Sequence, residues 1–447
     1  MAFSSAALLG VLETHTPVAA TGLVVAVSGG ADSACLLTAL TQAGSQPFRG
    51  LPVRAIHVNH GLQPAAVEFH HACEVLCRGL AVPLTVVAAS VDAGPGVSLE
   101  AAARDARYAA LARQIKEGEC LLTAHHADDQ TETLLLQLLR GAGLKGLAAM
   151  PLCRPWAGGW HLRPLLHTAR RDLHRFGAGA GVTAVRDPMN DDMRFDRNYL
   201  RRQVLPVIEA RWPGAALAVS RSAGHVAAAQ DLLERTAAQS VGVLRDGDAL
   251  SVAGLRSLTG PQQRNTLRHW IAENSARPPS TARLDEALRQ ILAADADHQP
   301  AILWDGHALR RYRNRLFLTP ASPPALHELR EWPVAAAPEL DLGGELGVLR
   351  WSTQAGGLDA ARLPEVLVVR RRRGGETLRV HRHARTRSLQ HLCQSFGILP
   401  WMRDALPLVY AGGDLIAVGD LWQDARWCVA PGAPGFGCTW RGAPILV

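Results

Sequence analysis

The stretch LVVAVSGGADS, Leu23 to Ser33, decides the fold of the first part of this chain. Its first five residues are apolar and mostly branched, which is typical of a buried strand. The segment that follows, Ala34 to Leu40, has the composition of a buried helix. A strand, a tight glycine turn and a helix start form an anion-binding site, because backbone N–H groups and the helix dipole point at a phosphate. We therefore expect a phosphate to bind at this turn.

The residues of the turn have separate expected roles. Two adjacent glycines let the backbone approach phosphate oxygens, and two serine hydroxyls add donors. An acidic residue adds repulsion to a phosphate cradle, so Asp32 indicates a role with Mg²⁺ or with a ribose. Asp32 is therefore also a candidate catalytic residue and Mg²⁺ ligand. The predicted ATP-binding residues of the turn are Ser28, Gly29, Gly30, Ala31, Asp32 and Ser33.

This turn differs from two commoner glycine-rich loops. The chain has neither G-x-x-x-x-G-K-[ST] here nor G-x-G-x-x-G after this strand, so a kinase-type loop and a dinucleotide fold are both disfavoured. S-G-G-x-D-S resembles the loop of the ATP pyrophosphatase superfamily. That resemblance implies an enzyme that cuts ATP between the α- and β-phosphates and attaches AMP to a substrate oxygen. The alternative interpretation is a strand-to-helix turn with no further role.

Strands and helices alternate along the first part of the chain. Strands are predicted at 23–27, 53–58, 84–87 and 120–124, and helices at 34–44, 64–80, 98–116, 129–140 and 198–209. The alternation predicts an α/β domain, with a doubly wound parallel sheet covered by helices on both faces. Ligands of such sheets bind at the carboxyl ends of the strands. We therefore expect the residues that follow the first, second and fourth strands to lie together.

The second candidate constellation is HHADDQTET, His125 to Thr133. Asp129 and Glu132 are three residues apart on a starting helix, so their carboxylates share a face and can hold Mg²⁺ or an ammonium group. The alternative interpretation is an ordinary helix cap and dipole partner. Because two histidines precede them and a phosphate loop lies opposite, we interpret His125, His126, Asp129 and Glu132 as catalytic.

Two further segments supply candidate contacts to nucleotide and RNA. Asn59 and His60 follow the second strand and are placed to contact the adenine or the ribose of ATP. Arg104 and Arg107 share a helix face and can pair with the α-phosphate or with tRNA phosphates. We assign Arg104 to ATP and Arg107 to tRNA. A solvated basic face is the alternative for these two arginines.

Length and composition limit the class of protein. The 447 residues suggest two or three domains. We predict a catalytic domain at 1–212, a mainly helical domain at 215–320, a linker at 320–338 and a small α+β domain at 340–447.

A net charge of +7 suits a polyanionic partner. The eight cysteines form no C-x-x-C pair, so we expect no zinc or iron–sulfur site. No apolar run is long enough to span a membrane, and with cysteines scattered in this way we expect a cytoplasmic protein. The sequence leaves open whether the chain forms a homodimer.

Taken in order, the motifs resemble those of tRNA(Ile)-lysidine synthases. The set is S-G-G-x-D-S, H-V-N-H-G-L, E-x-x-A-R-x-x-R-Y and A-H-H-x-D-D-Q-x-E-T, and the match continues at 140–147, 163–166, 187–190, 197–201, 372–376 and 399–404. The resemblance is weakest over 215–320. It implies that ATP adenylates the 2-carbonyl oxygen of the wobble cytidine in a tRNA(Ile) with a CAU anticodon. Free L-lysine then displaces AMP, and the product, lysidine, changes the tRNA from methionine to isoleucine identity.

Under this interpretation the remaining candidate residues handle lysine and tRNA. Asp129 and Glu132 hold the lysine ammonium and take its proton, directly or through one of the two histidines. The segment 370–387 holds eight arginines and one acid, which suits tRNA phosphates. The predicted tRNA-binding residues are Arg107, Arg197, Arg201, Arg202, Arg371, Arg372 and Arg373.

Three other functions are weighed against this one. A tRNA thiolase of this superfamily generally needs paired cysteines, which the chain lacks in C-x-x-C spacing. A GMP synthetase needs a glutamine-hydrolysing unit, and no matching nucleophile motif is present. A tRNA-binding protein with an inactive ATP site would not need intact Ser28, Asp32, Ser33, Asp129 and Glu132.

Overall fold

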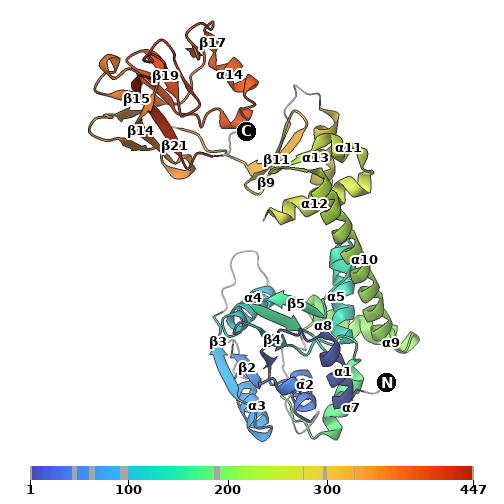
Figure 1. The fold of residues 1–447 in the computed structure, drawn as a ribbon. Coiled ribbons are helices and arrows are strands. Elements are labelled where there is room, and N and C mark those ends of the chain that lie inside the picture. The colour runs from blue at the N-terminus through green and yellow to red at the C-terminus, as the bar shows by residue number, and fades with distance from the viewer. Residues whose placement is uncertain are drawn as a thin grey trace. The chain divides into compact units, whose positions relative to one another are not determined.

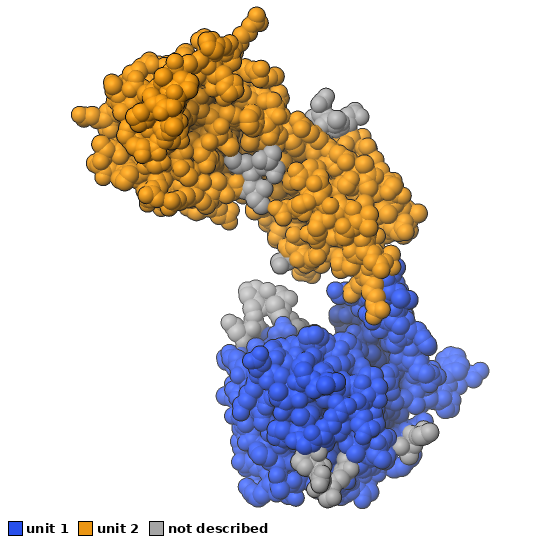
Figure 2. Space-filling model, viewed as in Figure 1, with its two compact units in different colours: residues 1–233 blue, residues 234–447 orange. Residues whose placement is uncertain are grey.

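The computed structural model describes residues 3–42, 48–59, 66–90, 99–185, 192–274, 276–294, 300–326 and 328–444. The chain divides into two compact units, residues 1–233 and 234–447 (Figure 2). Among the described residues, no helix combines the length and the apolar character that a membrane span requires.

Unit 1 is built around a six-stranded sheet in the order β3-β2-β1-β4-β6-β5 (Figure 1). Strands β1 to β4 and β6 pair in parallel, and β5 pairs antiparallel with β6 at one edge. The predicted parallel sheet is confirmed, whereas the sequence pattern does not predict the β5–β6 hairpin. The strands are β1 Gly22–Ala26, β2 Val53–Asn59, β3 Leu84–Ala88, β4 Glu119–Leu122, β5 Cys153–Trp156 and β6 Gly159–Leu162.

Helices cover both faces of this sheet. Alternate residues of a strand point to opposite faces, so Val25 packs in the core that includes α2 while Val24 packs in the core that includes α4. A strand buried on both faces has to be apolar throughout, which explains the unbroken apolar run before the glycine turn. The helices are α1 Ser5–His15, α2 Ala31–Gln42, α3 Ala66–Gly79, α4 Leu99–Ala112, α5 Ala127–Leu139, α6 Leu144–Leu147 and α7 Arg170–Gly179.

The strand order creates a crevice at the centre of the sheet. The chain adds β2 and β3 on one side of β1 and then returns to place β4 on its other side. Ligands of open α/β sheets bind where the order reverses in this way, beyond the carboxyl ends of the strands. Helix α2 begins shortly after β1, and α5 begins shortly after β4. The two motifs therefore flank the same crevice.

Two predicted helices have different bounds from those expected. Helix α4 ends at Ala112 rather than at Lys116, because the chain turns there and Gly118, at φ +77°, leads into β4. The helix predicted at 198–209 is found as three successive segments, the middle one with π-helical hydrogen bonding. Such π-segments are frequent at functional sites. The segments are α8 Asp196–Tyr199, η3 Leu200–Val204 and α9 Leu205–Arg211, and α10 Ala215–Leu244 follows them.

The first part of unit 2 is mainly helical, as predicted, but it also contains a five-stranded antiparallel sheet. Trp270 and Leu284 from the helices and Leu309 from the sheet are fully buried in one core. Arginines interrupt the apolar alternation in β10 and β11, so the pattern does not predict these strands. The elements are β7 Arg245–Asp246, β8 Ala249–Ser251, α11 Val252–Ser257, α12 Gly260–Glu273, α13 Thr281–Ala293, β9 Ala301–Trp304, β10 His307–Tyr312 and β11 Arg315–Pro320.

The last part of unit 2 is the α+β region predicted from the sequence. The linker expected at 320–338 is wrong in part, because β12 lies within it and Trp332 is fully buried against Trp351 at 5.6 Å between ring centroids. Proline and alanine on either side hide this short strand from a composition argument. The elements are β12 Arg330–Trp332, β13 Glu339–Asp341, β14 Val348–Ala355, β15 Leu367–Arg370, β16 Thr377–Leu378, β17 Arg387–Ser388, α14 Leu389–Ser395, β18 Leu408–Ala411, β19 Asp414–Val418, β20 Trp422–Gln423 and β21 Pro434–Arg441, with short 3-10 turns between some of them.

Candidate active site

The glycine turn after β1 is held in shape by its own two serines. The Ser33 hydroxyl donates to the Gly30 carbonyl at 3.1 Å and accepts from the Ser28 N–H at 3.1 Å. The Ser28 hydroxyl lies 3.1 Å from that of Ser33 and accepts from the Gly30 N–H at 3.3 Å. The first N–H groups of α2 have no partner within the helix, because every helix leaves its first donors unmatched. The turn therefore presents helix-start donors on a preformed loop.

Gly29 can only be glycine in this turn. Its φ of +82° is a backbone conformation that other residues rarely adopt. A Cβ added here would lie 3.0 Å from the carbonyl oxygen of Phe69 and 3.1 Å from its Cα. Both atoms belong to backbone, which cannot move aside as a flexible side chain can. The close approach of α3 therefore fixes this position of the loop.

Asp32 points toward two histidines. Its Oδ1 lies 2.8 Å from Nε2 of His174 on α7, and its Oδ2 lies 3.6 Å from Nε2 of His126. Burial favours the neutral acid, but the hydrogen bonds from His126 and His174 outweigh it and hold the pKa of Asp32 well below its usual range. The carboxylate is therefore ionised and, at 33% side-chain exposure, reachable from solvent.

The residues present fit a magnesium ion only in one way. The described residues contain no group of three or more His, Cys, Asp or Glu side chains placed to hold a metal. Mg²⁺ is, however, commonly held by one or two carboxylates together with substrate phosphates and water. Ionised Asp32 beside the phosphate loop meets that requirement, so a nucleotide has to supply the other oxygens.

His126 is both the N-cap of α5 and a neighbour of the carboxylates. The Asp129 carboxylate accepts from the His126 backbone N–H at 3.0 Å, and the His126 ring accepts from the Asp129 N–H at 3.4 Å. The expected cap formed by Asp129 with Glu132 is wrong, because α5 begins at Ala127 and its capping box pairs His126 with Asp129. Burial lowers the pKa of His126, but the negative charges of Asp129 and Asp32 outweigh it and raise that pKa above the usual value.

Arg201 joins the two acidic residues of the second motif. Its Nε lies 2.7 Å from Glu132 Oε1 and its Nη2 lies 3.0 Å from Glu132 Oε2, while Nη2 also lies 3.0 Å from Asp129 Oδ1. The Glu132 side chain is fully buried, and burial raises its pKa against the opposing charge of Arg201. Arg201 lies in the π-helical segment η3, whose geometry brings it across the crevice to α5.

His125 begins a chain of hydrogen bonds that runs away from the crevice. Its Nδ1 lies 2.8 Å from Thr123 Oγ1, which lies 2.9 Å from His161 Nε2. Nδ1 of His161 in turn lies 3.2 Å from Nη2 of Arg163. The sequence motifs assign no role to Thr123, His161 or Arg163. The available signal is that all three are polar residues at the ends of buried strands, where a polar side chain needs partners.

The other predicted residues of unit 1 occupy varied environments. Asn59 is half-buried at the end of β2, whereas His60 and the motif at 187–190 lie outside the described residues. The guanidinium groups of Arg104 and Arg107 lie 5.3 Å and 5.8 Å from the ring centre of Tyr108. Burial lowers the pKa of Arg107.

Arg197 and Arg202 lie close to Arg201 along the chain. Arg197 donates to the Thr133 hydroxyl at 3.4 Å, and Arg202 is exposed. The three arginines predicted at 371–373 lie in unit 2. Arg371 and Arg373 are exposed, whereas Arg372 pairs with Asp404 at 2.8 Å.

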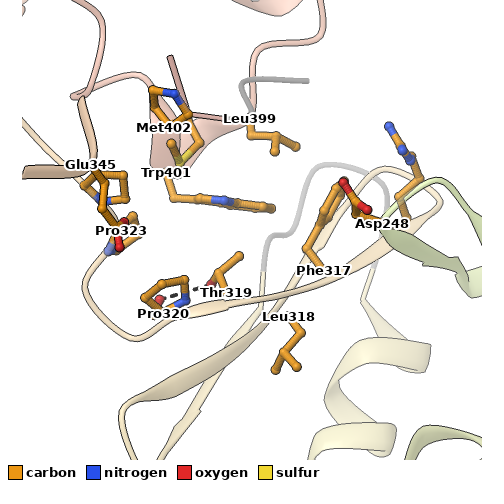
Figure 3. A pocket seen from close by; sticks show the side chains of 13 residues that line it. Asp248, Phe317, Leu318, Thr319, Pro320, Pro323, Glu345, Leu399, Trp401 and Met402 are labelled. Carbon is orange, nitrogen blue, oxygen red and sulfur yellow. Dashed lines mark hydrogen bonds between the residues drawn. The ribbon is translucent and has the colours of Figure 1, made fainter. Parts of the chain in front are cut away.

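A separate cavity of about 300 Å³ lies within unit 2 (Figure 3). The rings of Trp401 and Phe317 meet there at a centroid distance of 5.4 Å, and Arg310 lies 5.7 Å from the Trp401 ring. Prolines and apolar side chains form most of the remaining wall, and none of the sequence-predicted site residues lines it. The crevice of unit 1, which holds the phosphate loop and the acidic pair, is the candidate active site.

A phosphate loop at the switch point of a parallel sheet, facing ionised and basic side chains, defines an ATP-using enzyme of the PP-loop class. Family models agree with this class. A PP-loop domain model matches residues 7–208, a TilS substrate binding domain model matches 250–317, and a TilS substrate C-terminal domain model matches 367–440.

Relatives of known name narrow the class to one family. The chain is 41% identical over 416 residues to the tRNA(Ile)-lysidine synthase of Alkalilimnicola ehrlichii, covering 92% of each chain. It is 37% identical over 419 residues to that of Coxiella burnetii, covering 93% of this chain and 91% of the relative. The chain belongs to the tRNA(Ile)-lysidine synthase family, which confirms the resemblance carried by the motifs.

Among solved structures, the chain is similar to a U34-tRNA thiolase from Methanococcus maripaludis. The two are 14% identical with a TM-score of 0.42, over 49% of this chain and 77% of that one.

Proposed function

We propose that this chain ligates free L-lysine to the 2-carbon of the wobble cytidine of tRNA(Ile) with a CAU anticodon. ATP first adenylates the cytosine 2-carbonyl oxygen and releases pyrophosphate. The lysine ε-amine then attacks that carbon and AMP leaves. The observation that carries this proposal is that His126 lies 3.6 Å from Asp32 of the loop 28–33 and 3.4 Å from Asp129, beyond the carboxyl ends of β1 and β4, in a chain of this family.

Splitting the reaction in two is what the chemistry demands. A ring carbonyl oxygen leaves poorly, whereas AMP leaves well, so covalent activation replaces one difficult step by two easier ones. The donors of the loop stabilise charge that develops on the phosphates. We assign Ser28 to Ser33 and Arg104 to the phosphates, and Asn59 with His60 to the adenosine. Mg²⁺, held by Asp32 and the nucleotide, would neutralise the charge of the departing pyrophosphate.

Lysine needs a proton acceptor. An amine with a pKa of about 10.4 requires roughly 4–5 kcal/mol to lose its proton at pH 7. We propose that Asp129 and Glu132 bind the ammonium group and accept that proton. Burial lowers the pKa of His125 to about 3, so its neutral ring is a weak base. Because the pKa of Glu132 is raised, its carboxylate is the better acceptor. Since Arg201 already bridges the two acids, an ammonium can bind only when Arg201 releases at least one carboxylate oxygen.

A reconstitution experiment tests the overall reaction. The purified chain is mixed with ATP, labelled lysine and a tRNA(Ile) transcript with a CAU anticodon. We expect lysine incorporation with equal release of AMP and pyrophosphate, and none with an elongator tRNA(Met) transcript that carries the same anticodon. Release of ADP would contradict the proposal, and sulfur incorporation or lysine-free tRNA binding alone would support the rival functions.

Replacing Glu132 with Gln tests the lysine site. The substitution removes the charge but keeps the shape, so adenylation should proceed while lysine transfer slows by about 10²–10⁴, the usual contribution of a proton acceptor. Adenylated tRNA should therefore accumulate. Glu273→Gln, which removes one partner of an exposed ion pair in unit 2, is the matched control. Unchanged lysine dependence, with no adenylated tRNA accumulating, would remove Glu132 from this role.

We propose further that the chain works in the cytoplasm as three parts, 1–212 for catalysis and 215–320 and 340–447 for tRNA. The described structure supports a separate catalytic part, whose core cluster draws only on residues before 212, whereas Ala249, Tyr312 and Phe317 of 215–320 pack in the cluster of 340–447. We propose that Arg107, Arg197 and Arg202 contact tRNA near the cleft and that Arg371 to Arg373 contact it from unit 2.

A further inference from the structure

The chain of hydrogen bonds behind His125 has a fixed direction, and Arg163 sets it. A guanidinium group only donates, so the Nδ1 of His161 that lies 3.2 Å from Arg163 Nη2 has to accept. A doubly protonated His161 is excluded, because it would place two cations in contact within the protein. Burial lowers the pKa of His161 to about 2, in agreement with this geometry.

The direction passes from His161 to Thr123. A neutral imidazole that accepts at Nδ1 carries its proton at Nε2, and that nitrogen lies 2.9 Å from Thr123 Oγ1. The rings of Tyr108 and Trp156 enclose His161, each with its centroid 5.7 Å away, so the ring has no room to turn over freely. Thr123 Oγ1 therefore accepts from His161.

The last step reaches His125. The Thr123 hydroxyl has one proton to donate, and among the described residues its only other partner is Nδ1 of His125, at 2.8 Å. Thr123 is nearly buried, so leaving this proton unmatched is unfavourable. Nδ1 of His125 thus accepts, and Nε2 carries the proton. Among the described residues Nε2 has no hydrogen-bond partner, and it is not one of the buried side-chain atoms that lack one, so its N–H is open to a bound molecule.

We propose that Arg163, His161 and Thr123 are positioning residues, which fix His125 as a neutral hydrogen-bond donor toward an oxygen atom of the bound substrates. This inference rests on the proposed function and changes one part of it, because His125 then donates a hydrogen bond and does not take the lysine proton. The acceptor is a phosphate oxygen of the nucleotide, which gains negative charge while the cytosine carbonyl oxygen attacks the α-phosphorus and pyrophosphate leaves. A neutral donor suits such an oxygen, because the donor needs no proton uptake before the reaction.

Two variants of His161, whose side chains have nearly the same shape as each other, distinguish the direction of these hydrogen bonds from their mere presence. In His161→Gln the amide oxygen can accept from Arg163 and the amide nitrogen can donate to Thr123, so the direction is kept. In His161→Glu the carboxylate only accepts, so Thr123 has to donate to it and accept from His125. The proton of His125 then moves to Nδ1, and Nε2 becomes bare.

The tautomer is read without any substrate. Nitrogen-15 NMR of the histidine-labelled full-length chain distinguishes the protonated from the bare nitrogen of a neutral imidazole, and the spectrum of His125→Gln assigns the signal. We expect the Nε2–H form in the wild-type chain and in His161→Gln, and the Nδ1–H form in His161→Glu. A wild-type signal from the Nδ1–H form, or no change in His161→Glu, would overturn the inference whatever the activity.

Activity tests the donor role. The rate of tRNA adenylation should fall by about 10²–10³ in His161→Glu, the usual effect of removing one preorganised donor, and by less than about tenfold in His161→Gln. A lower rate at unchanged KM for ATP would show that the hydrogen bond acts in the transition state, and a raised KM for ATP would show that it already forms with the bound nucleotide. Equal adenylation in both variants would overturn the donor role.

A second pair covers the case in which His161→Glu does not fold. Thr123→Val keeps the volume and removes the hydroxyl, so His125 should show both tautomers, whereas Thr123→Ser should retain the wild-type form. A single Nε2–H form in Thr123→Val would contradict the inference. If the wild-type chain forms no lysidine but shows the expected tautomer, the proposed function fails while the hydrogen-bond direction stands.

Discussion

At the scale of single residues, the sequence predicts the types of side chain in the crevice better than their partners. Ser28, Gly29 and Asp32 are found from a local motif, because their roles follow from one turn. Arg201 lies 69 residues from Glu132 along the chain, and only the fold brings the two together. For the same reason its role as the partner of both acids could not be predicted from spacing.

The residue-scale prediction for the loop concerns Gly29. Gly29→Ala places a Cβ against the Phe69 backbone at positive φ, so we expect a loss of about 1–3 kcal/mol in unfolding free energy. ATP binding should weaken as well, since the loop has to shift. Gly30→Ala is the control, because its Cβ would lie 3.4 Å from the Ser28 hydroxyl, an ordinary contact. Urea unfolding with and without ATP measures both effects, and equal stability of the two variants would contradict the argument.

A second residue-scale prediction concerns pH. The pKa of His161 falls from 6.5 to about 2 on folding, so below pH 6.5 the unfolded chain binds a proton that the folded chain does not. Stability therefore decreases as the pH falls below 6.5, by about 2 kcal/mol at pH 5 from this group. His161→Gln should flatten the pH dependence of urea unfolding over this range. The control is His225→Gln, at an exposed position of α10, and an unchanged slope in His161→Gln would refute the assignment.

At the scale of elements, long periodic segments are predicted well and short strands are not. The alternating strands and helices of unit 1 are confirmed because β1 and β4 are buried and almost wholly apolar, while β3 is partly exposed but still rich in branched residues. The arginine-containing strands β10 and β11 lack that uniformity. β12 is only three residues long, and its one buried anchor, Trp332, is surrounded by turn-forming residues.

The element-scale prediction concerns helix α14, Leu389–Ser395. Ser388 is its N-cap and accepts from the His391 N–H at 3.2 Å. Ser388→Ala should therefore reduce the stability of unit 2 by about 1 kcal/mol. Ser222→Ala is the control, because Ser222 is exposed within α10 and its hydroxyl bonds only to the carbonyl of Ala218. Denaturant unfolding compares the two, and an equal effect would contradict the cap assignment.

At the scale of the whole molecule, the residues expected to act on ATP and the arginines expected to bind tRNA belong mainly to different units. The residues that would activate ATP all come from unit 1, whereas the arginine-rich segment 370–387 belongs to unit 2. Composition predicts that segment, because eight arginines with one acid stand out in any context. Composition does not predict that Arg372 is paired with Asp404. This ion pair leaves less of the positive charge available to bind RNA phosphates.

The whole-molecule prediction follows from this difference. Among the described residues neither Arg371 nor Arg373 has an ion-pair partner. Replacing both with Gln should lower the slope of log affinity for tRNA against log salt by about 1.4–1.8, at roughly 0.7–0.9 per phosphate contact. Arg372→Gln should change the slope less. Arg289→Gln, at an exposed arginine paired with Glu286, is the control. A salt titration of tRNA binding measures all of these, and an unaltered slope would exclude the segment as a phosphate contact.

The bridge that Arg201 forms across Asp129 and Glu132 has an electrical consequence. The protein supplies its own cation to these acids before any substrate arrives, so an arriving ammonium exchanges with a guanidinium and the net charge at the acids is conserved. Dissolved ions weaken the attraction of the two acids for the guanidinium and their attraction for the ammonium alike. Lysine should therefore bind with nearly the same strength in dilute and in concentrated buffer, while the nucleic acid is released as the buffer becomes more concentrated.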